Sequence, residues 1–274
     1  MGNKQNKIKK NIKEKENIQK KENIQENEYY NEFYKEMEEN CSNIIKEMNL
    51  TFDSKKIKNN LSKYSLNEEF IILIESGSLA PPHKMHLGLM EISKKYIEEH
   101  YKTKKVIGGF LVPSSDDYVK YKLKKDFIPL EHRVKMTKLM IKDSDWLECL
   151  DWGLAVGDEI KICLQKMINN LFPKYNIKCI LVFGIDFYLR CGMVLFDTCV
   201  CVFRPGYDVE KVKKMYPENL IFVEGKDEDV SSTLIRKAIR EKDEKIINEL
   251  TSKEIVDYIK NNDIFNKAID KNIQ

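Results

Sequence analysis

Two histidines lie three residues apart in a loop that could hold the phosphates of a nucleotide. The segment GSLAPPHKMH covers residues 77–86, so Gly77 precedes His83 and His86. A glycine at a strand exit lets the backbone approach an anion, and the N-terminus of a following helix offers free N–H groups and a positive dipole end. The imidazole rings could donate to phosphate oxygens as neutral groups or as imidazolium. A helix cap with incidental histidines has the same spacing, whereas a zinc site lacks further Cys or His ligands nearby in the sequence.

A second polar group precedes a helical pattern near the C-terminal end. The segment SSTLIRKAIR covers residues 231–240, and its Ile and Ala side chains mark one buried stripe. We expect a serine at the front of the segment to be the N-cap and Thr233 and Arg236 to stay free of the core face. Hydroxyl groups and a guanidinium at a helix start form a second cradle for a polyphosphate. Taken alone, the segment also fits an ordinary capped surface helix.

A third candidate is the segment FGID at residues 183–186. Gly184 would leave a strand, and the Asp186 carboxylate would follow at the height where a ribose hydroxyl can bind. This pattern is weak by itself.

Short apolar runs predict the elements that must position these residues. They lie at 70–76, 106–112, 177–183, 199–203 and 220–223, with a weaker run at 147–150. Helical patterns lie between them at 85–96, after Pro129 and at 157–170. The alternation predicts an α/β domain over residues 66–274, a Rossmann-like doubly wound parallel sheet with helices on both faces. Ligands of such sheets bind beyond the carboxyl ends of the strands, which selects the loops after residues 76 and 183.

The N-terminal part divides into two segments. Residues 1–28 form a Lys-, Glu- and Asn-rich tail that repeats KENIQ and is too polar to bury a face. Residues 29–65 form a helical extension, with one apolar stripe made by Tyr30, Phe33, Met37, Cys41, Ile44 and Met48. The stripe would pack on the following domain, or against a second copy or a partner. A Gly2 myristate beside the lysines would be a lipid anchor, although Asn6 replaces the preferred Ser or Thr.

Composition excludes several classes of protein. Lys and Arg number 47 against 44 Asp and Glu, so no positive excess indicates a nucleic-acid partner. Seven cysteines without a C-x-x-C pair favour reduced thiols in an intracellular protein, either cytoplasmic or nuclear. The longest apolar runs are strand-length, so we expect no transmembrane segment.

The two loops together resemble the signatures of the nucleotidylyltransferase superfamily. GSLAPPHKMH is similar to G-[SG]-F-x-P-x-[HT]-x-x-H, and SSTLIR is similar to I-S-S-T-x-I-R, in the same order and at a similar separation. Further matches resemble the eukaryotic nicotinamide mononucleotide adenylyltransferases in particular. They are Met85, a loop with Pro113, Asp116, Tyr118 and Lys120, the Pro129-x-x-His132-Arg133 helix start, Trp146-x-Glu148, Gly184-x-Asp186 and Val202-x-Arg204-x-Gly206.

The resemblance implies transfer of the adenylyl group of ATP to nicotinamide or nicotinic acid mononucleotide, with a divalent cation, Mg²⁺, bound mainly by phosphates and water. It implies an ATP site made of Gly77, Ser78, Leu79, His83, His86, Gly184, Asp186, Ser232, Thr233 and Arg236, of which His86, His83 and Arg236 would be catalytic. Tyr118, Lys120 and Arg204 would bind the mononucleotide, and no protein side chain is assigned to the metal. Tyr118 has packing as an alternative, and Lys120 has an ordinary solvated surface position.

The sequence departs from this family where the pyridine ring should bind. The family stacks the ring on Trp residues, but one of these positions falls near Glu159, and only Leu195 and Phe196 offer a replacement for the other. Two other functions therefore stay open: adenylyl transfer to another phosphate acceptor such as phosphopantetheine, and a non-catalytic nucleotide-binding scaffold.

Overall fold

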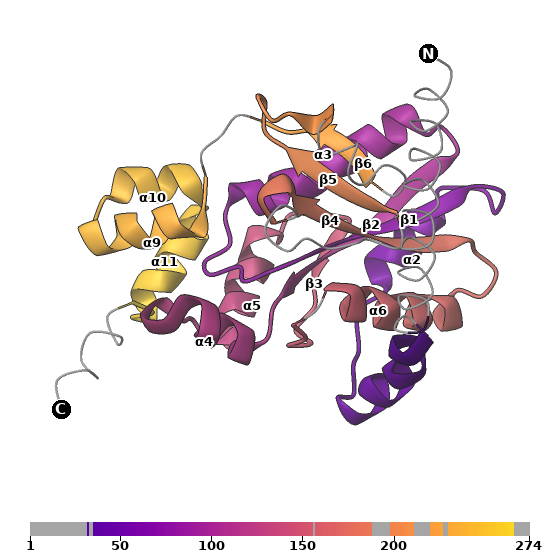
Figure 1. Ribbon diagram of the computed structural model, residues 1–274, viewed down its shortest axis with the longest axis horizontal. Helices are drawn as coiled ribbons and strands as arrows, with labels where there is room; N and C mark the ends of the chain where they lie inside the picture. The colour runs from indigo at the N-terminus through magenta and orange to yellow at the C-terminus, as the bar shows by residue number, and fades with distance from the viewer. Residues whose placement is uncertain are drawn as a thin grey trace, which may run out of the picture.

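Six strands form one parallel sheet in the order β3-β2-β1-β4-β5-β6 (Figure 1). The strands are β1 (Glu69–Gly77), β2 (Lys104–Pro113), β3 (Leu147–Cys149), β4 (Ile177–Gly184), β5 (Cys199–Phe203) and β6 (Leu220–Glu224). The computed structural model describes residues 32, 35–155, 157–187, 198–210, 220–226 and 230–265. The strand order reverses direction between β1 and β4, so the ligand-binding crevice of such a sheet lies there.

Strand β1 is buried on both faces because apolar side chains occupy successive positions. Phe70, Ile72 and Ile74 belong to one core cluster, and Ile71 and Leu73 belong to another. Successive side chains of a strand point to opposite faces, so this run supplies two cores at once. Each fully buried aliphatic side chain stabilises the fold by about 1.5–3 kcal/mol.

Helices cover both faces of the sheet (Figure 1). The helix α3 (Lys84–His100) packs through Met90 and Ile97 on the face that contains Leu73. The helices α2 (Lys55–Leu61) and α6 (Gly157–Leu171) pack on the opposite face, as Ile57 and Ile160 show.

Two adjacent glycines in β2 allow this close packing. A Cβ at Gly109 would lie 2.6 Å from the Trp146 ring and 2.8 Å from the Met90 methyl carbon. A Cβ at Gly108 would lie 2.9 Å from Ile57 on the other face. The sequence VIGGFLV therefore lets a side chain from each covering layer reach the backbone of the strand.

Five helical segments gather beyond one end of the sheet (Figure 1). They are α4 (Asp116–Leu123), α5 (Leu130–Met140), α9 (Ser232–Glu241), α10 (Glu244–Leu250) and α11 (Lys253–Asn261), with the short 3₁₀ helix η1 (Lys124–Asp126) between α4 and α5. Val119, Met136 and Ile255 join α4, α5 and α11 in one buried cluster. This group places the C-terminal helices beside the carboxyl ends of the strands.

The helix at residues 35–47 docks on the α6 side of the domain. Cys41 is buried, and its Sγ lies 2.7 Å from the Sγ of Cys163. Trp152 Nε1 donates to the Thr51 carbonyl at 2.7 Å, which fixes the chain between this helix and α2. Packing on the following domain is therefore observed for the described part of the apolar stripe, although Met48 is 47% exposed.

The predicted tail, Tyr30 and Phe33 lie outside the described residues. The domain boundaries at residues 28 and 65 stay predictions.

The α/β sheet predicted from the sequence is confirmed, including the weak third strand. The loop expected around Tyr118 and Lys120 is wrong, because α4 spans this segment. Ser115 caps α4 by accepting from the Tyr118 N–H, and Val119 is the buried residue of the helix, so the sequence contains little helical periodicity there. Among the described helices, none has both the length and the apolar character needed to cross a membrane.

Candidate active site

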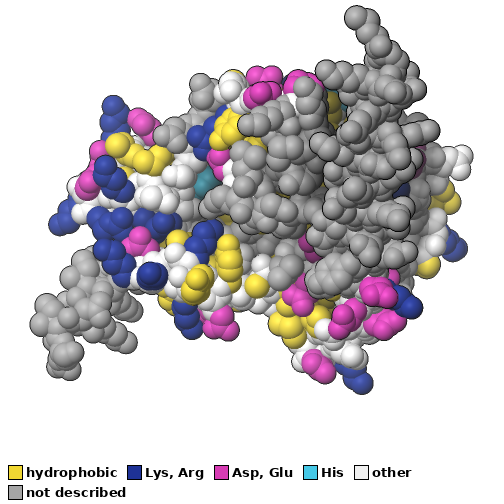
Figure 2. Space-filling view, in the orientation of Figure 1, with side chains coloured by type: hydrophobic (Ala, Val, Ile, Leu, Met, Phe, Trp, Pro, Cys, Tyr) yellow, Lys and Arg dark blue, Asp and Glu magenta, His cyan; other side chains and the backbone are white. Residues whose placement is uncertain are grey.

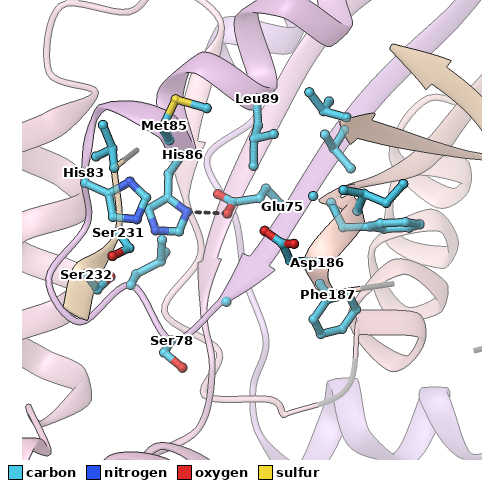
Figure 3. Close-up of a pocket in the computed structure, with 18 of the residues that line it drawn as sticks. Glu75, Ser78, His83, Met85, His86, Leu89, Asp186, Phe187, Ser231 and Ser232 are labelled. Carbon is cyan, nitrogen blue, oxygen red and sulfur yellow. Dashed lines mark hydrogen bonds and ion pairs between the residues drawn. The ribbon is translucent and has the colours of Figure 1, made fainter. Parts of the chain in front are cut away.

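A cavity of about 380 Å³ opens at the carboxyl ends of β1, β4 and β5 (Figure 3). Its wall includes both predicted phosphate-binding segments. The lining residues that the sequence had singled out are Gly77, Ser78, Leu79, His83, His86, Gly184, Asp186, Arg204, Ser232, Thr233 and Arg236. The topology brings these distant segments together at the point where the strand order reverses.

Arg133 of α5 fixes the beginning of the first loop from beneath. Its side chain is fully buried and donates to the Ser78 carbonyl at 3.1 Å, the Ser114 carbonyl at 2.7 Å and the Ile128 carbonyl at 2.8 Å. It also forms an ion pair with Asp116 at 2.9 Å. One guanidinium thus connects the segments that follow β1 and β2, a role that no local pattern in the sequence indicates.

The C-terminal helices hold the rest of this loop through three side chains. The bonds run from Arg236 Nη1 to the Ala80 carbonyl at 2.8 Å, from Ser232 Oγ to the Pro81 carbonyl at 2.8 Å, and from Thr251 Oγ1 to the Pro82 carbonyl at 3.0 Å. Side chains of the second motif therefore help to hold the loop of the first motif in place.

Arg236 is less free than the sequence predicted. It is 6% exposed, forms an ion pair with Asp126 at 3.3 Å and donates to Thr233 Oγ1 at 3.1 Å. Burial lowers the pKa of Arg236, and Asp126 opposes that shift. Arg236 lines the cavity and is buried against the first loop, where it donates to a backbone carbonyl. The expectation that a serine caps α9 is confirmed, since the Ser231 hydroxyl accepts from the Leu234 N–H.

His83 is the N-cap of α3, but its side chain makes no capping hydrogen bond. It is 7% exposed, its ring stacks on His86 with centroids 3.9 Å apart, and its buried Nδ1 has no partner. Burial, then the neighbouring His86 and Arg204, lower the pKa of His83 to about 2. His83 is therefore a neutral imidazole at physiological pH.

His86 has a carboxylate partner that the sequence analysis missed. Its Nδ1 lies 2.5 Å from Glu75 Oε1, a contact drawn as the dashed line in Figure 3. Glu75 is 4% exposed near the end of β1, and both His86 Nε2 and Glu75 Oε2 are buried without a hydrogen-bond partner in the described part of the chain. A carboxylate two residues before the strand-ending glycine, within an otherwise apolar strand, is the signal that could have found this pair.

The opposite wall contains the predicted ribose-binding residues. A Cβ at Gly184 would meet no protein atom within 4 Å, so the missing side chain leaves open space at this wall of the pocket. Asp186 accepts a hydrogen bond from the Tyr207 hydroxyl and lies 3.8 Å from Arg204. That bond raises the pKa of Tyr207, a residue that the sequence analysis did not select.

Two of the three predicted mononucleotide-binding residues lie outside the wall of this cavity. Tyr118 and Lys120 are exposed on α4, whereas Lys122 of the same helix lines the cavity and donates to Ser78 Oγ at 3.1 Å. Arg204 lines the cavity as expected.

The aromatic wall of the cavity comes from β4 rather than from the positions that the resemblance pointed to. The rings of Phe183 and Phe187 line the cavity with centroids 6.0 Å apart. Glu159 lies on α6 and does not line it. Leu195 and Phe196 lie outside the described residues.

Basic side chains gather near the α4 edge of this region. Figure 2 shows Lys and Arg side chains over the side of the molecule formed by α9, α10 and α11. The exposed members on α4, η1 and α9 are Lys120, Lys122, Lys124, Lys125, Lys237 and Arg240. A local positive field of this kind attracts phosphate-bearing ligands although the whole chain is nearly neutral.

Comparisons with known proteins agree with this arrangement. The family model described as cytidylyltransferase-like matches residues 76–238. The nicotinamide/nicotinic acid mononucleotide adenylyltransferase of Arabidopsis thaliana is 25% identical over 221 residues, covering 71% of this chain and 90% of the relative. The relative of the same name from Oryza sativa subsp. japonica is 23% identical over 251 residues, covering 82% of this chain and 97% of the relative.

A solved structure has the same fold. The Plasmodium falciparum nicotinic acid mononucleotide adenylyltransferase complexed with APC superposes with a TM-score of 0.52 at 16% identity, covering 72% of this chain and 97% of that chain. The resemblance predicted from the two motifs is thus confirmed by the relatives, and the fold by the structure. Since the family model spans more than half of the chain and both of its motifs line one pocket, the chain belongs to the cytidylyltransferase-like family.

Proposed function

We propose that the protein transfers the adenylyl group of ATP to nicotinamide mononucleotide or nicotinic acid mononucleotide, forming the dinucleotide and pyrophosphate. The observation that carries the proposal is the single pocket lined by His86 of the first motif and by Ser232 and Thr233 of the second. The names of the plant relatives support the same reaction and the same pair of acceptors.

In this reaction an oxygen of the mononucleotide 5′-phosphate attacks the α-phosphorus of ATP in line. The new P–O bond forms while the bond between the α-phosphorus and the oxygen leading to the β-phosphate breaks, and pyrophosphate leaves with that electron pair. The attacking oxygen is already ionised at neutral pH, so no protein nucleophile is needed. Catalysis comes from alignment of the two substrates and from neutralisation of charge as the bonds change.

The chain supplies donors for each part of ATP. We assign His86 to the α-phosphate, and His83, Thr233 and Arg236 to the β- and γ-phosphates. The helix α3 begins directly after His83, and a helix N-terminus offers backbone N–H groups and a positive dipole end to an anion. These donors can neutralise both the transferred phosphoryl group and the leaving pyrophosphate.

The remaining assignments concern the nucleosides. Gly77, Ser78 and Leu79 would form the floor under ATP, and Gly184 and Asp186 would meet its ribose. We place the mononucleotide phosphate near Arg204, with Tyr118 and Lys120 approaching from α4. The rings of Phe183 and Phe187 give the pocket an aromatic wall against which a base can pack.

We propose that Mg²⁺ is the divalent cation and that it arrives as the MgATP complex, held by phosphates and water. The described residues include no group of three or more His, Cys, Asp or Glu side chains that could hold a metal ion. The protein therefore offers no cage of its own in that part of the chain, and none of the steps above passes through the ion. When bound to ATP, Mg²⁺ neutralises phosphate charge.

The cellular setting is also part of the proposal. Seven cysteines without a C-x-x-C pair support an intracellular, cytoplasmic or nuclear protein with reduced thiols. Self-association through the N-terminal segment and an N-terminal lipid anchor are proposals that light scattering and mass spectrometry of the protein from cells would test.

The decisive experiment measures pyrophosphate release with MgATP and either mononucleotide in separate reactions. We expect turnover with at least one acceptor, and His86→Ala should lower kcat about a hundredfold because it removes one oriented donor. The control is His100→Ala, since His100 lies at the exposed C-terminal end of α3. Its side chain contacts the Tyr96 carbonyl and stacks on the Tyr96 ring. ATP binding without turnover on any acceptor would refute the proposed function.

A further inference from the structure

We infer that Glu75 is a positioning residue that holds His86 as an imidazolium whose Nε2–H is aimed at a phosphate of bound ATP. The inference rests on the proposed function only in taking the pocket to be an ATP site. It assigns a role to a residue outside both sequence motifs.

The position of the first proton follows from the Glu75–His86 contact. We take Glu75 as an ionised carboxylate, which can only accept a hydrogen bond, and therefore assign the proton of the 2.5 Å contact with Glu75 Oε1 to Nδ1 of His86. The short distance is that of a charge-assisted bond. Glu75 thereby fixes both the tautomer and the orientation of the ring.

The position of the second proton follows from what Nε2 must do. With Nδ1 protonated, a neutral His86 would present a lone pair at Nε2, and a lone pair repels phosphate oxygens. Nε2 is buried and has no hydrogen-bond partner among the described residues, so it is placed to serve a ligand. It can donate to phosphate only if the ring carries both protons, and the Glu75 carboxylate supplies the balancing negative charge.

The negative charge of Glu75 and the positive charge of His86 must balance each other for the pocket to bind phosphate. Glu75 is 4% exposed, and its Oε2 is also buried without a partner. A carboxylate at the base of a phosphate site repels ATP unless a cation stands between them. In the inference His86 is that cation, and Figure 3 shows the Glu75 carboxylate beside the His86 ring, joined to it by the dashed contact.

The other ionisable groups of the pocket come from every element around His86. They are His83 before α3, Lys122 on α4, Asp186 after β4, Arg204 after β5, Lys226 after β6 and Arg236 on α9. Burial lowers the pKa of His83 to about 2, so the ring stacked on His86 adds no charge. The phosphates of bound ATP add negative charge beside His86 and so favour the imidazolium in the complex.

The first test measures binding of the non-reacting analogue α,β-methylene-ATP with Mg²⁺ by calorimetry. The proteins are the wild type, Glu75→Gln, His86→Ala and the double variant, with Glu69→Gln at the opposite, exposed end of β1 as the matched control. We expect His86→Ala to weaken binding, and Glu75→Gln in that background to restore it about tenfold, because the bare carboxylate is gone. A double variant that binds no better than His86→Ala would overturn the inference.

The same variants make a prediction about pH. Glutamine can still accept from Nδ1 but carries no charge, so Glu75→Gln should bind the analogue nearly as well as wild type at about pH 6 and about tenfold more weakly at about pH 8. A loss that is equal at both pH values would indicate a purely structural role and overturn the inference.

The second test observes the protons directly by long-range ¹H–¹⁵N NMR of the histidine rings, with His86 identified by the signal missing in His86→Ala. With the analogue bound at about pH 7.5, wild-type His86 should be doubly protonated and its Glu75→Gln counterpart neutral. A neutral wild-type ring would overturn the inference and leave the proposed function standing. Binding with a doubly protonated ring but no turnover on any mononucleotide would refute only the proposed function, and no binding at all would overturn both.

Discussion

Replacing Arg133 by methionine should destabilise the protein by about 3 kcal/mol. The side chain is fully buried and donates to three carbonyl groups as well as to Asp116. Methionine has a similar length but donates nothing. The substitution therefore leaves carbonyl oxygens without partners at the junction of β1, β2 and α5.

The size of this loss depends on whether water can reach each acceptor that Arg133 no longer contacts. The Ser114 and Ile128 residues are buried, so each carbonyl loses a partner at about 1–3 kcal/mol. Asp116 has a side chain that is 37% exposed, and Ser78 borders the cavity, so water can replace Arg133 at both. The desolvation of the guanidinium, which lowers the pKa of Arg133, is also relieved and offsets part of the loss.

Urea unfolding followed by circular dichroism measures this loss. The control is Lys138→Met on the same helix, where a 52% exposed side chain lies 3.8 Å from Asp151 and should contribute less than about 0.5 kcal/mol. A loss for Arg133→Met below about 1 kcal/mol, or equal to that of the control, would refute the claim that Arg133 holds the loop.

Three further substitutions test the packing and the pocket. Gly109→Ala should cost about 1–3 kcal/mol in urea unfolding, because the new methyl would lie 2.6 Å from the Trp146 ring and 2.8 Å from Met90. His83 stays neutral in the fold with a pKa of about 2, while the unfolded chain takes up its proton below about pH 6.5. The stability that depends on a neutral His83 is therefore fully present above about pH 6.5 and declines as the pH falls toward 2. The free energy of unfolding of His83→Gln should consequently fall less steeply than that of the wild type between about pH 6.5 and 4. An equally steep fall would contradict this. Gly184→Ala should leave the melting temperature nearly unchanged, because a Cβ meets no protein atom within 4 Å, but should weaken binding of an ATP analogue about tenfold by filling ligand space. Unchanged binding would show that the space is not used.

The sheet was predictable because its strands are buried on both faces. The run at residues 70–74 is apolar at every position, and this signal is local and strong. The helix α4 was missed because Val119 is its buried residue and the rest of the segment is rich in lysine and exposed tyrosine. Its start depends on the Ser115 cap and on a tertiary contact, since Asp116 accepts from the Leu130 N–H at 2.7 Å.

The candidate site was predictable where its residues belong to short sequence motifs. Parallel strands bring their carboxyl ends to one edge, so the loops after β1 and β4 had to meet. The contacts of Glu75 and Arg133 with the first loop were not predicted, because each residue acts through a partner far away in the sequence or in another element. Glu75 resembles an ordinary polar residue near a strand end until His86, eleven positions later, is placed beside it. Tyr207 was missed for the same reason, since it follows β5 whereas its partner Asp186 follows β4.

The loop carbonyls explain why two motifs so far apart in the chain belong together. A loop that turns backbone N–H groups toward an anion must also place carbonyl oxygens somewhere nearby, and these repel phosphate. Here the carbonyls of residues 78, 80, 81 and 82 are each held by a side-chain donor, from Arg133, Arg236, Ser232 and Thr251 respectively. The second motif thus removes negative ends from the proposed phosphate site as well as offering donors to it. A substitution at Ser232 or Arg236 consequently changes the shape of the first loop, and its effect on ATP binding cannot be assigned to a lost phosphate contact alone.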